Sequence, residues 1–394
     1  MCIDGEQPIL IFVSLYSFHK TIISALPHNF ATPPNSTNLH RFQILIMADL
    51  TDFDPNSAGN PNNNIFGLPF TEDESRLVIV PVPWEVTVSF GSGTARSAEQ
   101  IMRASLQVDL FDPDVPDGWK QGFYMRDTDK KVLLKSDYLR KEAELYINYI
   151  SNGDLVENNQ FMCKTLREVN EGSIFLNNWV YQQTKALLDQ GKLVALLGGD
   201  HSTPLGFYKA IAEKHGDFGI LQIDAHCDLR ESYEGFVYSH ASVMYNALNE
   251  IPHLKKLVQI GIRDFSEGEW EYLQQHTERV KTYFDRDIRF RQYEGETFKQ
   301  ITEEIIGSLP DKVYISFDID GLDPKLAPNT GTPVQGGFET EQIFYIFNKL
   351  KQSGKKIIGF DLNEVSTSEN GWDANVGARI LFKMCNLLIA SNPL

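Results

Sequence analysis

From residue 175 to the end of the chain, apolar runs of strand length alternate with segments of helical periodicity, and this alternation constrains the fold most strongly. Strands of continuous apolar character are typical of a parallel sheet that helices cover on both faces. A further apolar run of strand length, residues 76–84, lies before residue 175. The expected strands are 76–84, 192–199, 218–226, 256–264, 312–321 and 355–365, and the expected helices are 175–190, 202–214, 266–276, 297–308, 339–352 and 373–391.

Composition limits the classes of partner. The chain has 394 residues, of which 42% are apolar, and this suits one large α/β domain or two smaller ones. A formal net charge of -17 argues against nucleic acid or an anionic membrane surface as a partner, and it fits a cationic small molecule or metal ions. Four cysteines without a C-x-x-C pair indicate a reducing compartment, so a cytoplasmic location is expected.

Several segments differ from the regular part. Residues 1–46 are expected to be an N-terminal extension outside the core, and their apolar run is too short and polar for a good membrane-spanning helix. Residues 47–75 are expected to form an irregular arm, and residues 76–394 are expected to form a single domain. Within it, 111–174 is predicted to be an insertion or lid with a helix near 138–150. Ser97 and Gln100 predict a capping box that opens a helix.

Polar clusters follow four of the predicted strands at their carboxyl ends, where ligands bind in such folds. "LLGGDHS", "QIDAHCD", "SFDIDGLDP" and "GFDLNEV" each end a strand. Period-2 spacing places the acids and imidazoles of one cluster on the same side. The side chains expected at this edge of the sheet are His201, Asp224, His226, Asp228, Asp318 and Asp320.

Four carboxylates converging without a lysine or arginine would repel one another strongly, and divalent cations remove that cost. Oxygen-rich ligands with two imidazoles suit Mn²⁺, Ni²⁺, Fe²⁺ or Zn²⁺. Six ligands are too many for one open site, so the pattern predicts two ions that share bridging carboxylates and activate a water molecule. Any one of these side chains seen alone would equally be a helix cap or a satisfied core residue.

The stretches GGDHS (198–202), DAHCD (224–228) and SFDIDGLDPKLAPNTGTPVQGG (316–337) resemble the three signatures of the ureohydrolase family of arginases and agmatinases. The resemblance covers about residues 75–392. It implies a three-layer α/β/α fold around an eight-stranded, mostly parallel sheet. It also implies a binuclear metal centre and a homo-oligomer, either a trimer or a hexamer, to which accessory proteins would deliver the metal.

Transferred by position, the resemblance assigns two ligand sets that share Asp224 and Asp318. The first set is His201, Asp224, Asp228 and Asp318, and the second is Asp224, His226, Asp318 and Asp320. The resemblance further implies that His240 shuttles protons, that Glu364 grips the guanidinium group of the substrate, and that Asp320 shares in proton transfer. A carboxylate can bind the paired N–H donors of a planar guanidinium. The implied products are urea and an amine or ammonia.

The loop after the second signature departs from the arginase pattern. "LRESYEGFVYSHAS" replaces the Asn- and Ser-bearing loop that reads the α-carboxylate of arginine, so arginine is a poor candidate substrate. "NPNNNIFGLPF", "VPWEVTVSFGSGT" and the 111–174 segment resemble the guanidinase subgroup within the agmatinase-like branch, which is taken to use Ni²⁺, whereas most of the family uses Mn²⁺. Free guanidine is therefore the expected substrate. Thr94 is expected near it, and Trp84 or Phe90 would stack on its plane.

Alternatives remain open from the sequence. Agmatine or a guanidino acid is the second choice of substrate, and Mn²⁺ is the alternative metal. A non-catalytic metal-binding member of the family and a deacetylase with a related sheet are remote alternatives. The first is disfavoured because all six ligand positions, His240 and Glu364 are present. A related deacetylase would keep fewer metal ligands.

Overall fold

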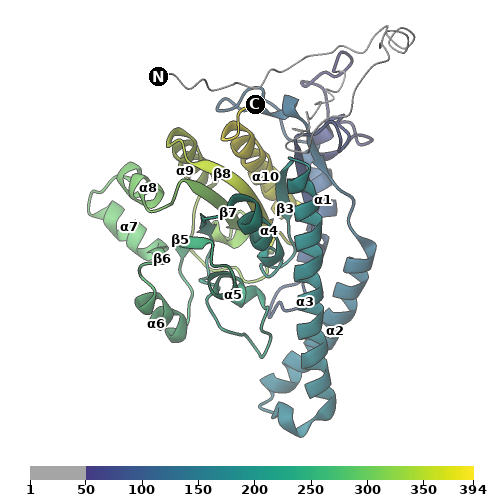
Figure 1. Cartoon of the computed structure of the whole chain (residues 1–394), viewed down its shortest axis with the longest axis vertical. Coiled ribbons are helices and arrows are strands. Elements are labelled where there is room, and N and C mark those ends of the chain that lie inside the picture. The colour runs from purple at the N-terminus through teal and green to yellow at the C-terminus, as the bar shows by residue number, and fades with distance from the viewer. Residues whose placement is uncertain (1–49) are drawn as a thin grey trace, which may run out of the picture. The chain divides into compact units, whose positions relative to one another are not determined.

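The computed structural model describes residues 50–394, and within them one eight-stranded sheet forms the centre of the molecule (Figure 1). The strands lie in the order β2-β1-β3-β8-β7-β4-β5-β6, and every neighbouring pair is parallel. The expected fold class is confirmed, with a sheet that is entirely rather than mostly parallel. The strands are β1 Leu77–Pro81, β2 Phe123–Met125, β3 Leu193–Leu197, β4 Phe218–Ile223, β5 Leu254–Ile262, β6 Val280–Phe284, β7 Lys312–Asp318 and β8 Lys356–Asn363.

Ten α-helices in the described residues cover the two faces of this sheet. They are α1 Ser97–Ser105, α2 Lys130–Ser151, α3 Gln160–Asp189, α4 Leu205–His215, α5 Val243–Glu250, α6 Glu267–Gln275, α7 Asp285–Tyr293, α8 Phe298–Gly307, α9 Thr340–Gln352 and α10 Trp372–Ala390.

Alternate residues of each strand enter two separate cores. In β1, Leu77 and Ile79 belong to one buried cluster, while Val78 and Val80 belong to the other. The first cluster includes side chains of α1, α8, α9 and α10, and the second includes side chains of α2, α3, α4 and α5. Because both faces of the sheet are buried, apolar side chains predominate on both faces of the strands, which is the pattern that predicted a parallel sheet.

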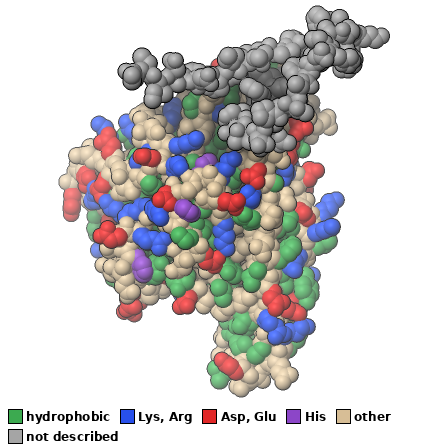
Figure 2. Space-filling model, in the orientation of Figure 1, with side chains coloured by type: hydrophobic (Ala, Val, Ile, Leu, Met, Phe, Trp, Pro, Cys, Tyr) green, Lys and Arg blue, Asp and Glu red, His purple; other side chains and the backbone are tan. Residues whose placement is uncertain are grey.

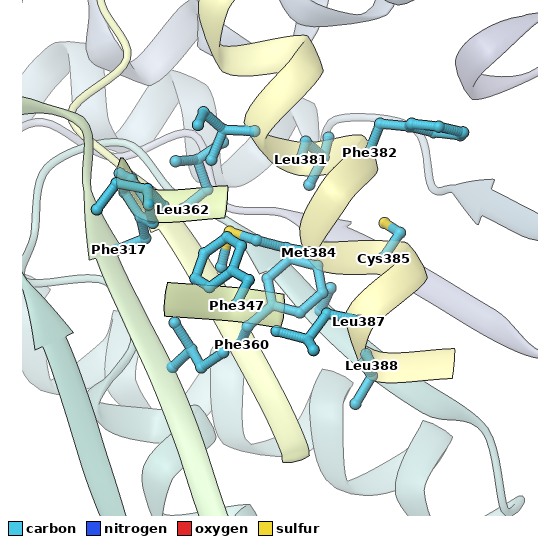
Figure 3. Close-up of a cluster of buried hydrophobic side chains, with 14 of the residues drawn as sticks. Phe317, Phe347, Phe360, Leu362, Leu381, Phe382, Met384, Cys385, Leu387 and Leu388 are labelled. Carbon is cyan, nitrogen blue, oxygen red and sulfur yellow. The ribbon is translucent and has the colours of Figure 1, made fainter. Parts of the chain in front are cut away.

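The C-terminal helix α10 packs on the sheet, and the close-up in Figure 3 shows this contact. Leu381, Met384 and Leu388 of α10 lie beside Phe360 of β8 and Phe347 of α9, and all five side chains are buried. Removing a buried aromatic ring such as Phe360 typically costs about 3–5 kcal/mol. The strand that carries Glu364 at its end is therefore held firmly from this face.

Residues 111–174 were expected to be an insertion with one short helix. They contain instead all of the long helix α2 and the first half of the long helix α3. The helix expected at 138–150 runs from Lys130 to Ser151, and the helix expected from 175 begins at Gln160. Asp129 caps the first of these, because its side chain accepts hydrogen bonds from two backbone N–H groups of the first turn. The buried stripe of α2 includes Ser136 and Ala143 at helical spacing, so its apolar periodicity was too weak to see.

Other short elements were not expected from the sequence, namely β2, β6, α5 and α7. The capping box predicted from Ser97 and Gln100 is wrong. Helix α1 begins after Arg96 without a side-chain cap, and the Ser97 hydroxyl donates to the backbone oxygen of Gly198 at 3.0 Å. This bond joins α1 to the end of β3, where the first polar cluster begins.

Two expectations concern the terminal segment and the membrane. The expected extension, residues 1–46, lies outside the described residues. Among the residues that the structure describes, no helix combines the length and the apolar character needed to cross a bilayer. Three of the cysteines, Cys163, Cys227 and Cys385, are free thiols, and the last two are buried.

Candidate metal centre

The four central strands of the sheet, β3, β8, β7 and β4, are neighbours, and each ends in one of the predicted polar clusters. His201 follows β3, Glu364 follows β8, Asp318 ends β7, and Asp224 follows β4. Because all four strands are parallel, their carboxyl ends meet at one edge of the sheet. Sequence segments as distant as residues 201 and 364 therefore lie side by side.

A first group of donor atoms surrounds His201. Its Nδ1 atom lies 2.9 Å from Asp224 Oδ2, 2.9 Å from Asp228 Oδ2 and 3.2 Å from Asp318 Oδ2. The four side chains are at most 5% exposed. A single imidazole nitrogen carries at most one proton, so it cannot satisfy three carboxylate oxygens.

A second group forms around His226, which is 24% exposed and so lies on the solvent side of the centre. Its Nδ1 atom lies 3.0 Å from Asp320 Oδ2 and 3.6 Å from Asp224 Oδ1. Asp224 therefore directs one carboxylate oxygen to each histidine. The two groups share this residue, which is the geometry expected of a bridging ligand.

Asp318 joins the first group more clearly than the second. Its Oδ2 atom faces His201, while its Oδ1 atom accepts a hydrogen bond of 2.9 Å from the backbone N–H of Asp320. This bond orders the short 3-10 helix Ile319–Gly321 that carries Asp320. The second bridging position expected for Asp318 thus stays a prediction, whereas the two oxygens of Asp224 already face both groups.

Burial and the neighbouring charges shift the pKa values of the cluster in opposite directions. Burial, together with the neighbouring Asp224, raises the pKa of Asp228 to about 7, and burial raises the pKa of Asp318 well above its usual range. Burial alone would lower the pKa of His201, but the carboxylates around it outweigh burial and raise it well above normal. The histidines in turn hold the pKa of Asp224 below its usual range despite burial.

Two divalent cations fit this set of donors. His201 Nδ1 and Asp228 Oδ2 are fully buried, and neither makes a hydrogen bond although each lies near the other. Buried polar atoms of this kind need a partner. Oxygen and imidazole ligands in two groups that share a carboxylate provide suitable partners for a pair of divalent ions, one in each group.

Behind the first group, a buried network fixes the ring of His201. Its Nε2 atom lies 2.9 Å from Ser316 Oγ, and the Ser316 hydroxyl donates to Asp361 Oδ1 at 2.9 Å. Tyr208 also contacts Ser316, at 2.8 Å. With the Ser316 proton directed at Asp361, the Ser316 oxygen accepts a hydrogen bond from Nε2–H. In the neutral imidazole Nδ1 is then unprotonated, and its lone pair is available to a metal ion. We did not expect this role for Ser316, although it precedes Asp318 at period-2 spacing.

A second network supports Asp224 from within the sheet. The Gln222 side chain donates to Asp224 Oδ2 at 2.8 Å and accepts from the Gln259 side chain at 2.7 Å. Gln259 accepts in turn from the Thr282 hydroxyl at 2.7 Å. All three donors point toward Asp224, so each bond polarises the next. This chain crosses β4, β5 and β6, and the only sequence signal for it was the position of Gln222, two residues before Asp224.

His240 lies beside the centre at the start of a short 3-10 helix, His240–Ser242. Its backbone N–H donates to Thr87 Oγ1 at 3.1 Å, and its Nδ1 atom lies 3.4 Å from the same oxygen. Burial first, and then His226 and His201, lower the pKa of His240 to about 3. The imidazole is therefore neutral near neutral pH.

Glu364 is buried, and its Oε1 atom accepts the backbone N–H of His201 at 3.0 Å. Its Oε2 atom makes no hydrogen bond. Burial, and then the charge of Asp200, raise its pKa well above the usual range. A Cβ added at Gly331 would come within 2.8 Å of Oε2, so only glycine leaves room for the carboxylate there. Glu364 also has φ 60°, an unfavourable conformation that typically costs about 1–2 kcal/mol.

Among the described residues, Thr94 makes no hydrogen bond to a side chain of the metal centre. Thr94 is fully buried, and its hydroxyl donates to Glu85 Oε2 at 3.2 Å. The same oxygen accepts the backbone N–H groups of Gly93 and Ala95, so Glu85 caps the turn that contains Thr94. Thr94 thus helps to shape the loop.

The two aromatic residues considered for stacking occupy opposite environments. Trp84 is completely buried in the second core, and its stacking role stays a prediction. Phe90 is 81% exposed, next to Gly91, whose N–H donates to the backbone oxygen of Gly331 at 2.9 Å. Phe90 therefore lies near the loop that borders Glu364.

Sequence comparisons agree with this geometry. A sequence model of the Arginase family matches residues 75–386. The chain is 30% identical over 295 residues to the N(1)-aminopropylagmatine ureohydrolase of Thermus thermophilus, which covers 75% of this chain and 84% of that protein. It is 32% identical over 224 residues to the guanidinobutyrase of Pseudomonas aeruginosa, covering 53% of this chain and 65% of that protein.

The fold is also similar to that of solved structures. The crystal structure of the agmatine ureohydrolase of Thermoplasma volcanium superposes with a TM-score of 0.59 and 23% identity. The similarity covers 80% of this chain and 90% of that one. Two chains this different in sequence therefore share the architecture built around the parallel sheet.

Proposed function

The chain belongs to the arginase family of metal-dependent hydrolases that cleave guanidino compounds, and from this premise we propose that it hydrolyses free guanidine to urea and ammonia. The proposal is supported by the close approach of Gly331 to the side chain of Glu364. Its unpartnered oxygen is covered by Gly331, and the backbones of Gly331 and Gly91 are hydrogen-bonded at 2.9 Å. A substrate without a tail needs only a carboxylate of this kind and the metal centre.

Glu364 would bind and orient the guanidinium. Its Oε1 atom is fixed by the His201 N–H, so Oε2 is the oxygen available for a substrate N–H group. Burial and Asp200 disfavour the charged form of this carboxyl group, and a bound cation would reverse that effect. The negative surroundings of Glu364 therefore favour a cationic substrate over a neutral one.

The proposed ligands are His201, Asp224, Asp228 and Asp318 for one ion, and Asp224, His226, Asp318 and Asp320 for the other. When bound, two divalent ions would activate a water molecule to attack the guanidinium carbon. We propose Ni²⁺ from the resemblance to the guanidinase subgroup, with Mn²⁺ as the alternative, because both accept oxygen and nitrogen ligands. Elemental analysis of protein purified from its own host distinguishes the two ions.

His240 and Asp320 would move the protons of the reaction. His240 would take up a proton that the attacking water releases and pass it to the departing nitrogen, which leaves as ammonia. Asp320 Oδ2 lies 3.0 Å from His226 Nδ1, on the more exposed side of the centre, and offers a second route for the same proton.

The chain would act as a homo-oligomer, a trimer or hexamer, which light scattering measures directly.

Two relatives support a second substrate class. The agmatine ureohydrolase and the guanidinobutyrase are named for guanidino compounds that carry an amine or a carboxylate tail. Urea release should be measured with guanidine, agmatine and 4-guanidinobutyrate after loading with Ni²⁺ or Mn²⁺. The highest kcat/KM is expected for guanidine, and a higher kcat/KM for agmatine or 4-guanidinobutyrate would replace guanidine by that compound.

A further inference from the structure

The antiparallel helices α2 and α3 project beyond the sheet, and Figure 1 shows them as a long hairpin. The apolar and charged side chains at its lower end are visible in Figure 2. The sequence of this segment alone does not indicate a chemical role for it. The hairpin, however, contacts two loops that border the metal centre: the entrance loop, residues 85–96, and the histidine loop, residues 233–240.

Helix α2 holds the entrance loop at three points. The Ser136 hydroxyl accepts the backbone N–H of Glu85 at 3.1 Å. Asp137 forms an ion pair with Arg96 at 2.8 Å. Arg140, whose side chain is 13% exposed, donates from one guanidinium nitrogen to the backbone oxygens of Val86 and Val88.

The contacts of Arg140 bear on His240 through a single residue. Thr87 lies between the two carbonyl groups that Arg140 binds, and its Oγ1 atom accepts the backbone N–H of His240 at 3.1 Å. The position of Thr87 Oγ1 therefore depends on the backbone that Arg140 fixes. A displaced Thr87 would release the residue that we assign to proton transfer.

Helix α3 holds the histidine loop through the side chain of Asn170. Asn170 donates to the backbone oxygen of Gly235 at 3.2 Å and accepts the backbone N–H of Val237 at 2.9 Å. The pair of bonds resembles the pairing of neighbouring strands, and it fixes both sides of Phe236. The Phe236 ring packs against Tyr146 of α2 with ring centroids 5.3 Å apart. Three residues after Val237 the chain reaches His240.

We propose that the α2–α3 hairpin is a clamp that positions His240, with Arg140 and Asn170 as its positioning residues. Arg140 acts on the Thr87 side of the imidazole, and Asn170 acts on the loop that carries it. The inference rests on the proposed function because it relies on the role of His240 in proton transfer. Neither residue belongs to the two groups of metal ligands, so the clamp can be weakened without removing a ligand.

The kinetic test uses Arg140→Gln and Asn170→Leu, with Lys164→Ala as the matched control. Lys164 is an exposed residue of α3 whose ion pair with Glu168 stays within that helix. A small displacement of a catalytic group costs up to about 100-fold in rate. In the metal-loaded enzyme we expect kcat to fall about 10- to 100-fold in both variants, with KM and metal content nearly unchanged, while the control keeps the wild-type values.

A double variant separates positioning from general damage. If Arg140 acts through His240, then Arg140→Gln should lower kcat by less than about twofold when His240 is already alanine. Equal losses in the presence and absence of His240 would overturn the proposal.

Hydrogen exchange of the metal-loaded protein tests the clamp without using activity. Asn170→Leu should speed exchange of the peptide 233–240, because the Val237 N–H loses its acceptor. Lys164→Ala should leave the exchange rate of this peptide unchanged. Unchanged exchange in Asn170→Leu would overturn the clamp even in an active enzyme. A wild-type protein that releases urea from no guanidino compound would instead refute the proposed function, while the exchange result still decides whether the hairpin holds the loop.

Discussion

Glu364 and His201 are joined by a hydrogen bond of 3.0 Å between the side-chain Oε1 of the first and the backbone N–H of the second. One residue is proposed to bind the substrate, and the other belongs to the metal centre. Their bond links the ends of β8 and β3, which are neighbouring strands. A guanidinium held by Glu364 would therefore keep a fixed position relative to any ion that His201 and its partners hold.

The substitution Glu364→Gln should abolish most activity without emptying the metal centre. The glutamine side chain would keep the size of the glutamate and the acceptor for the His201 N–H but would lose the negative charge. Losing one partner of a buried charged pair costs about 2–5 kcal/mol, so kcat/KM should fall by at least about 30-fold. Steady-state urea release and metal analysis of the same sample measure both quantities. A normal kcat/KM would show that another group binds the substrate.

A single methyl group at Gly331 should have a related but smaller effect. A Cβ at this position would lie 2.8 Å from Glu364 Oε2, so the carboxylate must move. We expect Gly331→Ala to lower kcat/KM about tenfold with metal content unchanged. Gly268→Ala is the control, because a Cβ at Gly268 has no neighbour within 4 Å. Equal activity of the two variants would place the substrate away from Glu364.

The shared position of Asp224 predicts different metal contents for two variants. His226 belongs to only one group of donors, so His226→Ala should retain about one ion per chain. Asp224 contributes an oxygen to both groups, so Asp224→Ala should retain less than one. Metal content after dialysis against a weak chelator measures this directly. A full pair of ions in either variant would contradict the assignment of that ligand.

Gln222 should affect metal affinity although it is not a proposed ligand. Its amide donates to Asp224 Oδ2, and Gln222→Leu removes that bond while keeping a buried side chain of similar size. Loss of such an outer partner typically lowers metal affinity about 10- to 100-fold. Competition with a chelator of known affinity gives the value. Thr282→Val, at the far end of the network, should weaken binding less, and equal losses would show that the effect is not transmitted through the amides.

His215 predicts a pH dependence of stability away from the metal centre. Burial first, and then Lys356, Lys312 and Lys214, lower its pKa to about 4 in the folded protein. Between about pH 6.5 and pH 4 the unfolded chain therefore binds this proton more readily than the folded chain. The stability associated with neutral His215 is complete above about pH 6.5 and is lost as the pH falls toward 4.

Thermal unfolding of the wild type and of His215→Gln measures this effect. The Tm of the wild type should fall more than that of the variant between about pH 7.5 and pH 5. Because both proteins share any loss of metal at low pH, the comparison isolates His215. A Tm difference that does not depend on pH would refute the prediction.

The sequence predicted the core of the fold because parallel strands leave a strong pattern. The strand expected at 312–321 is β7, and its acids lie at the carboxyl end, as do those after β4. Period-2 spacing placed Asp224, His226 and Asp228 together, and the structure brings them to one edge with His201 and both acids of the third cluster. Local periodicity and strand polarity were enough for this part.

The supporting residues could not be predicted because their partners are distant in the sequence. Gln259 reaches Gln222 only because β5 lies beside β4, and Ser316 reaches His201 only through the order of the central strands. The helix α2 was underestimated because its buried stripe includes Ser136 and Ala143. Thr94 was expected near the substrate, and only the position of Glu85 shows where its hydroxyl points.

The order of the central strands also bears on biosynthesis. The last strand to be made, β8, is inserted between β3 and β7, which are both made before it. A ribosome-bound chain that ends before residue 356 therefore has a gap in the middle of its sheet, between the histidine after β3 and the carboxylates of β7. The first group, which joins His201 to the carboxylates at the ends of β4 and β7, would then be complete only after β8 is in place, so we expect this group to bind its ion late in maturation.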